Sequence, residues 1–175
     1  MRAILVLAAF TIAGCGVGHL VRPDDHLALG TDTLFVLAVH SNEYATLTFC
    51  RDADYGSCLT TPQLRRDQPV QLYQVPAGRY CLLDILIEPY TGGSGSVHIQ
   101  ILPERSVCFV ARTGVIAYPG DLELTSTPVD GAYWTVVPHW SSSDDIDQRV
   151  DAQYPVIRGA IIEVSRPVPY LAPAR

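Results

Sequence analysis

Short apolar segments of strand length, separated by turn residues, are the feature that most constrains the fold of this chain. Residues 45–50 alternate, with Ala45, Leu47 and Phe49 on one side and polar threonines on the other, and residues 97–101 alternate in the same way. A period of two places alternate side chains on opposite faces of a sheet. Turn signals recur roughly every 8 to 12 residues, which is typical of an antiparallel sandwich or barrel.

The chain also contains one segment with helical character. Ser143 suits an N-cap, Ile146 and Val150 are spaced to face a core, and Pro155 stops the helix. We therefore predict a mainly β fold, an antiparallel β-sandwich with one short helix near the C-terminus. The predicted strands cover residues 33–40, 45–50, 69–75, 79–87, 97–101, 106–111, 115–118, 122–126, 133–137 and 156–164.

Four cysteines lie within this strand-rich region, and four cysteines allow three pairings. Cys50 and Cys58 flank a polar segment that can fold back on itself, whereas Cys81 and Cys108 each lie in an apolar, strand-like run. We predict the disulfides Cys50–Cys58 and Cys81–Cys108, which suit an oxidising compartment. A zinc site favours closely spaced cysteine pairs, and this chain has none, so we predict no metal site and no cofactor.

The charge of the chain argues against nucleic acid as a partner. The 175 residues include 12 basic residues, all arginine, and 18 acidic residues, which gives a net charge of −6. No basic stripe is present, and nucleic-acid binding depends on one.

The N-terminal segment has the pattern of an export signal. Arg2 is the only charge before Cys15, and residues 3–13 are nearly all apolar but fewer than the about 20 residues that span a bilayer. The segment ends in Ile12-Ala13-Gly14-Cys15, which resembles the lipobox of bacterial prolipoproteins. An ordinary signal peptide cut elsewhere, or an uncleaved anchor, is the alternative.

The lipobox resemblance implies that Cys15 becomes the first residue and holds the protein on a membrane. Its sulfur would carry a diacylglycerol and its amine a fatty acid such as palmitate. Two or three acyl chains give a lasting anchor, while one gives only reversible binding. Since Gly16 follows the cysteine in place of aspartate, the resemblance implies the outer membrane of the cell envelope, on the periplasmic side.

These patterns divide the chain into one folded domain and its flanking segments. Glycines and a proline interrupt any period before Thr31, and three prolines follow Arg166. We predict a lipoprotein signal peptide at 1–14, a flexible tether at 15–31, the β-sandwich domain at 32–165 and a Pro-rich tail at 166–175.

Two turns in the predicted domain resemble those of envelope proteins. Val75-Pro76-Ala77-Gly78-Arg79-Tyr80 is similar to a P-x-G-x-Y turn of small envelope β-sandwiches, and residues 118–124 look like an aromatic-Gly-Asp hairpin of uncharacterised lipoproteins. The transthyretin-like and carboxypeptidase-regulatory sandwiches are the nearest architectures. The resemblance covers residues 72–124 and implies a fold but no catalytic residues.

The candidate ligand contacts are Trp140 and His139. Tyr133, Trp134 and Trp140 form the densest aromatic cluster, which suits either the core or a stacking surface for sugar, peptide or peptidoglycan. His139 precedes the serines of residues 141–143 and an aspartate, a set that hints at acyl transfer, although a triad requires geometry that adjacency does not supply.

These observations favour a lipid-anchored binding or structural module of the cell envelope rather than an enzyme. Its partners would be the membrane, through Cys15, and an envelope protein or peptidoglycan. The alternatives are an envelope hydrolase or carbohydrate-active enzyme that uses His139 with nearby Ser and Asp, and a small-ligand carrier with a sizeable apolar cavity.

Overall fold

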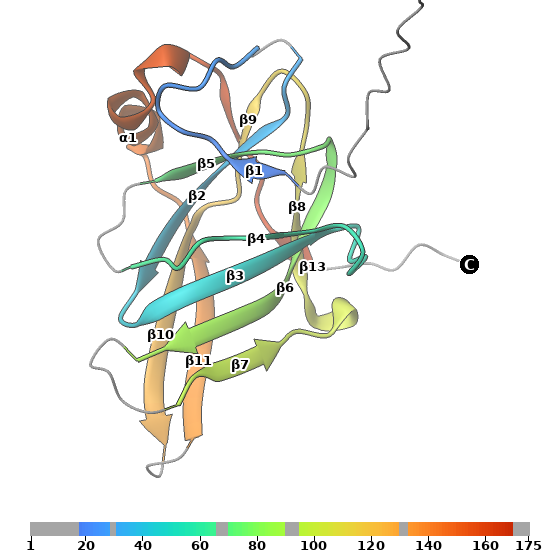
Figure 1. The fold of residues 1–175 in the computed structure, drawn as a ribbon, viewed down its shortest axis with the longest axis vertical. Coiled ribbons are helices and arrows are strands. Elements are labelled where there is room, and N and C mark those ends of the chain that lie inside the picture. The colour runs from blue at the N-terminus through green and yellow to red at the C-terminus, as the bar shows by residue number, and fades with distance from the viewer. Residues whose placement is uncertain (1–17, 29–30, 66–69, 90–94, 130–132, 170–175) are drawn as a thin grey trace, which may run out of the picture.

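Two β-sheets pack face to face, and a single α-helix covers part of the outer face of one sheet (Figure 1). The computed structural model describes residues 18–28, 31–65, 70–89, 95–129 and 133–169. The predicted mainly β sandwich with one helix near the C-terminus is confirmed.

The first sheet has seven strands, in the order β1-β5-β2-β10-β11, with β9 beside β2 and β12 beside β9. Its strands are β1 (His19–Leu20), β2 (Leu34–Ser41), β5 (Gln71–Gln74), β9 (Ile116–Tyr118), β10 (Asp121–Val129), β11 (Tyr133–Ser141) and β12 (Ile162–Val164).

The second sheet has six strands, in the order β13-β8-β6-β3-β4, with β7 also paired to β6. Its strands are β3 (Tyr44–Arg51), β4 (Cys58–Thr60), β6 (Gly78–Glu88), β7 (Val97–Gln100), β8 (Val107–Ala111) and β13 (Val168–Pro169). A short 3-10 helix, η1 (Pro103–Arg105), precedes β8.

The seven-stranded sheet is mixed, whereas the sequence pattern predicts only antiparallel pairing. β2 runs parallel to both β9 and β10, and β9 runs parallel to β12. The cause is the path of the chain, which leaves this sheet after β2 to build strands of the other sheet and later returns beside β2. A tight hairpin joins antiparallel strands, but a long crossover also permits parallel ones.

Aromatic rings fill the space between the two sheets. The Phe35 ring lies 5.0 Å from the Phe109 ring and 5.1 Å from the Tyr73 ring, measured between centroids. Phe49 and Tyr80 complete this cluster, and all five side chains are buried. This packing counts against the carrier hypothesis, since it fills the place where a cavity between the sheets would lie.

A second core lies between the seven-stranded sheet and helix α1 (Ile146–Gln153). Ile146 and Val150 are buried there, as predicted, beside Tyr118. The N-cap is Asp145 rather than the predicted Ser143, and the helix gives way to the 3-10 helix η2 (Pro155–Ile157). No helix in the described ranges is long and apolar enough to cross a bilayer.

The N-terminal segment differs from the predicted tether at 15–31. Residues His19–Leu20 form β1 against β5, and Val21 is 2% exposed. The Val21 N–H donates to the Leu72 carbonyl at 2.8 Å. A few backbone hydrogen bonds and one apolar side chain are enough to attach this segment to the sheet. So short a strand produces no periodic pattern in the sequence. Residues 15–17 and 29–30 lie outside the described residues.

The C-terminal segment is also more attached than predicted. Val168–Pro169 pairs with β8, so the described part of the predicted tail at 166–175 joins the second sheet. The predicted strand at 156–164 is reduced to β12, because residues 155–157 form η2 instead. Residues 170–175 lie outside the described part of the chain.

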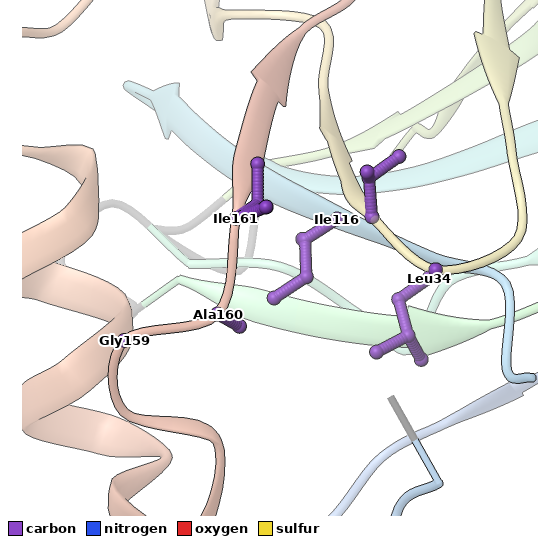
Figure 2. A pocket seen from close by; sticks show the side chains of 7 residues that line it. Leu34, Ile116, Gly159, Ala160 and Ile161 are labelled. Atoms are coloured by element: carbon purple, nitrogen blue, oxygen red, sulfur yellow. The ribbon is translucent and has the colours of Figure 1, made fainter. Parts of the chain in front are cut away.

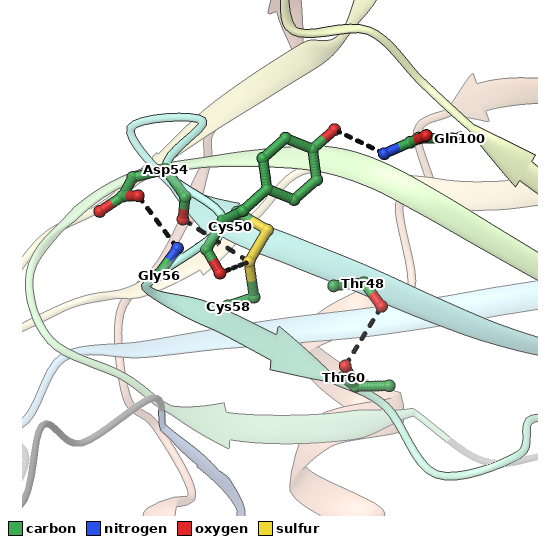
Figure 3. Close-up of a disulfide and its surroundings, with 8 residues drawn as sticks. Thr48, Cys50, Asp54, Gly56, Cys58, Thr60 and Gln100 are labelled. Carbon is green, nitrogen blue, oxygen red and sulfur yellow. Dashed lines mark hydrogen bonds between the residues drawn. A yellow bond between two sulfur atoms is a disulfide. The ribbon is translucent and has the colours of Figure 1, made fainter.

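Both predicted disulfides, Cys50–Cys58 and Cys81–Cys108, are present. Cys58, Cys50, Cys81 and Cys108 face one another in register across four adjacent strands. Figure 3 shows the first disulfide, where the Asp54 carboxylate accepts a hydrogen bond from the Gly56 N–H at 2.9 Å and closes the intervening loop. The two disulfides indicate an oxidising compartment.

Candidate functional site

The candidate site lies where one long strand path is interrupted. β9 and β10 follow each other along β2, with Pro119-Gly120 between them. Leu34 pairs with Ile116, but Ala38 pairs with Asp121, so this path has one residue more than β2 between the two pairs. An extra residue of this kind is a β-bulge, which bends the strand and re-aims its side chains.

The strand path also changes partner at the bulge. Val164 of β12 pairs with Tyr118, whereas Ser141 of β11 pairs with Asp121. The space between the ends of β11 and β12 is a cleft of about 420 Å³. Three distant segments line this cleft, which we call the Trp140 cleft: Pro119, Gly120, Trp140, Ser141, Ser142, Val164, Arg166 and Pro167.

The Trp140 cleft combines an aromatic ring, hydroxyls and a cation. The Trp140 Nε1 is buried and has no hydrogen-bond partner among the described residues. Arg166 is exposed, and within the described ranges it forms no ion pair. Indole rings stack on sugar or peptide faces, and guanidinium groups bind carboxylates with two donors. The cleft can therefore hold a ligand that carries both a flat apolar face and an acid.

A buried carboxylate directly follows the cleft residue Gly120. Asp121 is 6% exposed, and its Oδ1 accepts a hydrogen bond from the Tyr118 hydroxyl at 2.5 Å. Its Oδ2 accepts from Arg149 Nη1 at 2.8 Å and from His40 Nε2 at 3.1 Å. These contacts join the bulge to the end of β2 and to α1. The Tyr118 hydroxyl in turn accepts from the Ser143 N–H at 3.2 Å, which fixes the chain that leaves β11.

The protonation of these two side chains follows from their surroundings. Burial alone would raise the pKa of Asp121, but the hydrogen bonds from Tyr118, Arg149 and His40 outweigh it and lower the pKa below its ordinary value. Burial, together with the neighbouring Asp121 carboxylate, raises the pKa of Tyr118. At neutral pH the site therefore holds a charged Asp121 and a neutral Tyr118 that donates to it.

Gly120 is required by the close approach of two strands. Its φ is +120°, and a Cβ there would lie 2.4 Å from the Ser141 carbonyl oxygen. No other residue fits this backbone without moving β11, since L-residues rarely adopt such a φ and the contact is with backbone.

The structure separates the two predicted ligand contacts. Trp140 lines the cleft, whereas His139 is exposed and belongs to the alternate face of β11, in register with Glu123. His139 makes no hydrogen bond to a serine or aspartate within the described residues, so the acyl-transfer constellation is not assembled there. Tyr133 and Trp134 lie in β11, but their side chains are outside the described part of the structure.

Gly120, Asp121 and Arg166 are site residues that the sequence did not reveal. The burial of Asp121 is visible only in the structure, and an unpaired carboxylate is rarely buried. Nothing in the sequence places Arg166 in the same cleft as Trp140, because this placement depends on β12 pairing with β9. The described residues contain no group of three or more His, Cys, Asp and Glu side chains that could hold a metal ion.

A second, smaller pocket lies at the beginning of β2 and β9 (Figure 2). Its volume is about 290 Å³, and we call it the apolar pocket. In Figure 2 the side chains of Leu34, Ile116, Ala160 and Ile161 surround one space. Gly114, Val115 and Gly159 complete its lining, which contains no polar side chain.

Comparison with known proteins assigns no family. No protein-family model and no curated protein matches the chain. A solved leucine-rich repeat protein from Bacteroides thetaiotaomicron is 8% identical and overlaps 57% of this chain with a TM-score of 0.34, so the chain spans 14% of that protein. A likeness of this extent carries no argument about fold or function.

Proposed function

We propose that this protein is a lipid-anchored binding module of the bacterial cell envelope. The proposal depends on the anchor sequence Ile12-Ala13-Gly14-Cys15, followed within a few residues by a sandwich that two disulfides staple. Disulfides persist in exported proteins, and a lipidated cysteine is one means of holding such a domain in the envelope. The outer membrane, facing the periplasm, is the proposed location, since Gly16 rather than aspartate follows Cys15.

The anchor is tested by expressing the full chain and its Cys15→Ser variant in a Gram-negative bacterium. The wild-type protein should fractionate with membranes and begin at Cys15 with a diacylglycerol on its sulfur, as measured by mass spectrometry. The Cys15→Ser variant should leave the membrane fraction. An unmodified thiol at position 15, or a retained leader, contradicts the proposal.

We assign ligand binding to the Trp140 cleft. Trp140 offers a ring, Ser141 and Ser142 offer hydroxyls, and Arg166 offers an exposed cation. This combination suits a glycan that carries carboxylates, and peptidoglycan is the glycan of this kind within reach of an envelope lipoprotein. No described contact favours the hydrolase alternative.

Co-sedimentation with purified peptidoglycan sacculi tests the cleft. The Cys15→Ser chain should sediment with the sacculi, and Arg166→Ala should weaken this binding about tenfold or more, since a hydrogen bond to a charged group contributes about 1.5–3 kcal/mol. Arg158→Ala is the matched control, because Arg158 is also exposed but lies outside the cleft. Equal binding by both variants, or none by the parent, contradicts the assignment.

A further inference from the structure

The apolar pocket and the N-terminal strand lie at the same end of the seven-stranded sheet. One row of paired residues crosses five strands there, so the residue that begins β1 shares this row with two residues of the pocket lining. The row is His19, Gln74, Leu34, Ile116 and Ile162. Ile161, on the rim of the pocket, precedes Ile162, and its carbonyl accepts a hydrogen bond from the Ile116 N–H at 2.9 Å.

The distance from Cys15 to this end is short. An extended residue spans at most about 3.3–3.6 Å, so the Cα of Cys15, four residues before His19, lies within about 14 Å of β1. Neighbouring strands are about 4.8 Å apart, which puts Leu34 about 10 Å from His19. A lipid on Cys15 is therefore held within the width of this sheet end.

The chemistry of this end suits acyl chains. The side chains that line the apolar pocket are aliphatic, and Ile161 is 69% exposed on its rim. Arg158, which precedes the pocket residue Gly159, is exposed and suits a lipid phosphate.

Three acidic side chains near the pocket in sequence each have a partner. Asp32 accepts from the Ala28 N–H at 2.7 Å, and Asp151 accepts from the Gly159 N–H at 3.3 Å. Glu163 pairs with Arg112 at 3.4 Å. Of these three acids, Glu163 is therefore balanced by an opposite charge, while the other two carboxylates keep theirs.

We propose that this end of the sandwich rests on the bilayer, with Ile161 and the apolar pocket against the acyl chains of membrane lipid. The inference rests on the proposed lipidation of Cys15, which supplies the affinity, while the apolar pocket fixes the orientation. An isoleucine this exposed beside an aliphatic hollow is costly in water and is stabilised by hydrocarbon.

This orientation leaves the Trp140 cleft open. Asp121 pairs with Ala38, which lies four residues further along β2 than Leu34, a separation of about 13 Å. The β10–β11 hairpin extends further still, to the lower end of the molecule in Figure 1. A ligand of the envelope can then reach the cleft while the opposite end faces lipid.

Quenching of tryptophan fluorescence by brominated lipid tests the orientation. The lipidated full-length protein is reconstituted into vesicles of phosphatidylethanolamine and phosphatidylglycerol, with or without bromine on the acyl chains. Ile161→Trp places a reporter at the proposed contact. Thr125→Trp is the matched control, because Thr125 is exposed on β10, beyond the end of β2. Trp134 and Trp140 contribute the same background to both variants.

The emission added by Ile161→Trp should fall by at least half in brominated vesicles, while that added by Thr125→Trp should be unchanged. Vesicle-bound protein with no quenching of the Ile161→Trp signal overturns this inference alone, as does equal quenching of both reporters. If the wild-type protein is expressed without a lipid on Cys15 and does not bind the vesicles, the proposed anchoring is overturned, and this inference with it. Circular dichroism of both variants verifies that the sandwich is intact.

Discussion

The carboxylate of Asp121 joins parts of the chain that are far apart in sequence: Tyr118 beside it, His40 at the end of β2 and Arg149 on α1. A buried charge is tolerated only where such partners replace water. The same residue follows the bulge that shapes the Trp140 cleft, so one side chain couples the position of the helix to the geometry of the site.

Removing this carboxylate should destabilise the fold. We expect Asp121→Ala to lower the free energy of unfolding by about 3 kcal/mol, because it removes the acceptor of the Tyr118 hydroxyl and leaves Arg149 only its 3.8 Å ion pair with the exposed Asp145. Glu123→Ala is the control, since Glu123 is exposed on the same face of β10 and should cost under about 0.5 kcal/mol. Urea unfolding measures both, and a similar cost for the two variants would refute this role for Asp121.

Gly120 tests a different cause at the same place. Gly95 also has a positive φ, +127°, but a Cβ there meets nothing within 4 Å, whereas at Gly120 it meets the Ser141 carbonyl. Gly95→Ala should cost about 1–2 kcal/mol from backbone strain alone. Gly120→Ala should cost about 1–3 kcal/mol more, because β11 must move. Thermal unfolding of the two variants compares them, and equal losses would exclude the steric contribution.

At the scale of elements, the row of four cysteines crosslinks four neighbouring strands of the second sheet in two pairs. Cys50 and Cys81 are paired residues in the middle of this row, and each forms its disulfide with the strand on its outer side. The two disulfides therefore hold β4 to β3 and β8 to β6, while hydrogen bonds alone join β3 to β6.

The two disulfides should differ in their contribution to stability. A crosslink stabilises more as the loop it closes lengthens, and the separations are 27 residues for Cys81–Cys108 and 8 for Cys50–Cys58. The chain-entropy relation gives about 3.5 kcal/mol for the first and about 2.5 kcal/mol for the second. We expect the double Cys→Ala variant at 81 and 108 to unfold at lower urea than the one at 50 and 58. The reverse order would show that native-state packing dominates.

Several elements were predictable because their signal is local. Alternation located β3 and β7, and continuous apolar runs located β2 and β8. The parallel pairs of the first sheet were not predictable, because they arise from crossovers that leave no local pattern. The sequence of η2 predicts part of a strand, since a short apolar run between turn residues has the same pattern in a strand and in a 3-10 helix.

The candidate site was only half predictable for the same reason. Trp140 is predictable from its neighbours in sequence. The predicted strand ends at residue 137, however, so the alternation that separates Trp140 from His139 appears only because β11 continues to Ser141. Arg166 reaches the cleft because β12 pairs with β9, whose residues lie 46 positions earlier in the chain, as Val164 opposite Tyr118 shows. Tertiary contacts of that kind are set by the whole fold rather than by any short segment.

At the scale of the whole molecule, buried tyrosines make the fold sensitive to alkali. Burial raises the pKa of Tyr80 to about 12 and raises the pKa values of Tyr73, Tyr118 and Tyr154 as well. The hydroxyl of each tyrosine is therefore a weaker acid in the folded chain than in the unfolded chain, whose tyrosines titrate near pH 10.

Below about pH 10 the contribution of these tyrosines to the free energy of unfolding should be constant. It should fall as the pH rises from there toward the pKa values of the folded state. Tyr80→Phe should reduce this fall, because it removes one of the groups that titrate only on unfolding. Tyr55→Phe is the control, since Tyr55 is half exposed. Urea unfolding at a series of pH values between 8 and 12 measures the slopes, and identical slopes for both variants would refute the tyrosine origin.

The small size of β1 has a mechanical consequence. Whatever holds the chain upstream of Gly18 pulls first on a strand of two residues, whose pairing to β5 is the weakest link between the N-terminus and the sandwich. Under tension the hydrogen bonds between β1 and β5 should break one after another, which lengthens the segment between the membrane attachment and the sandwich, while the crosslinked second sheet keeps its shape.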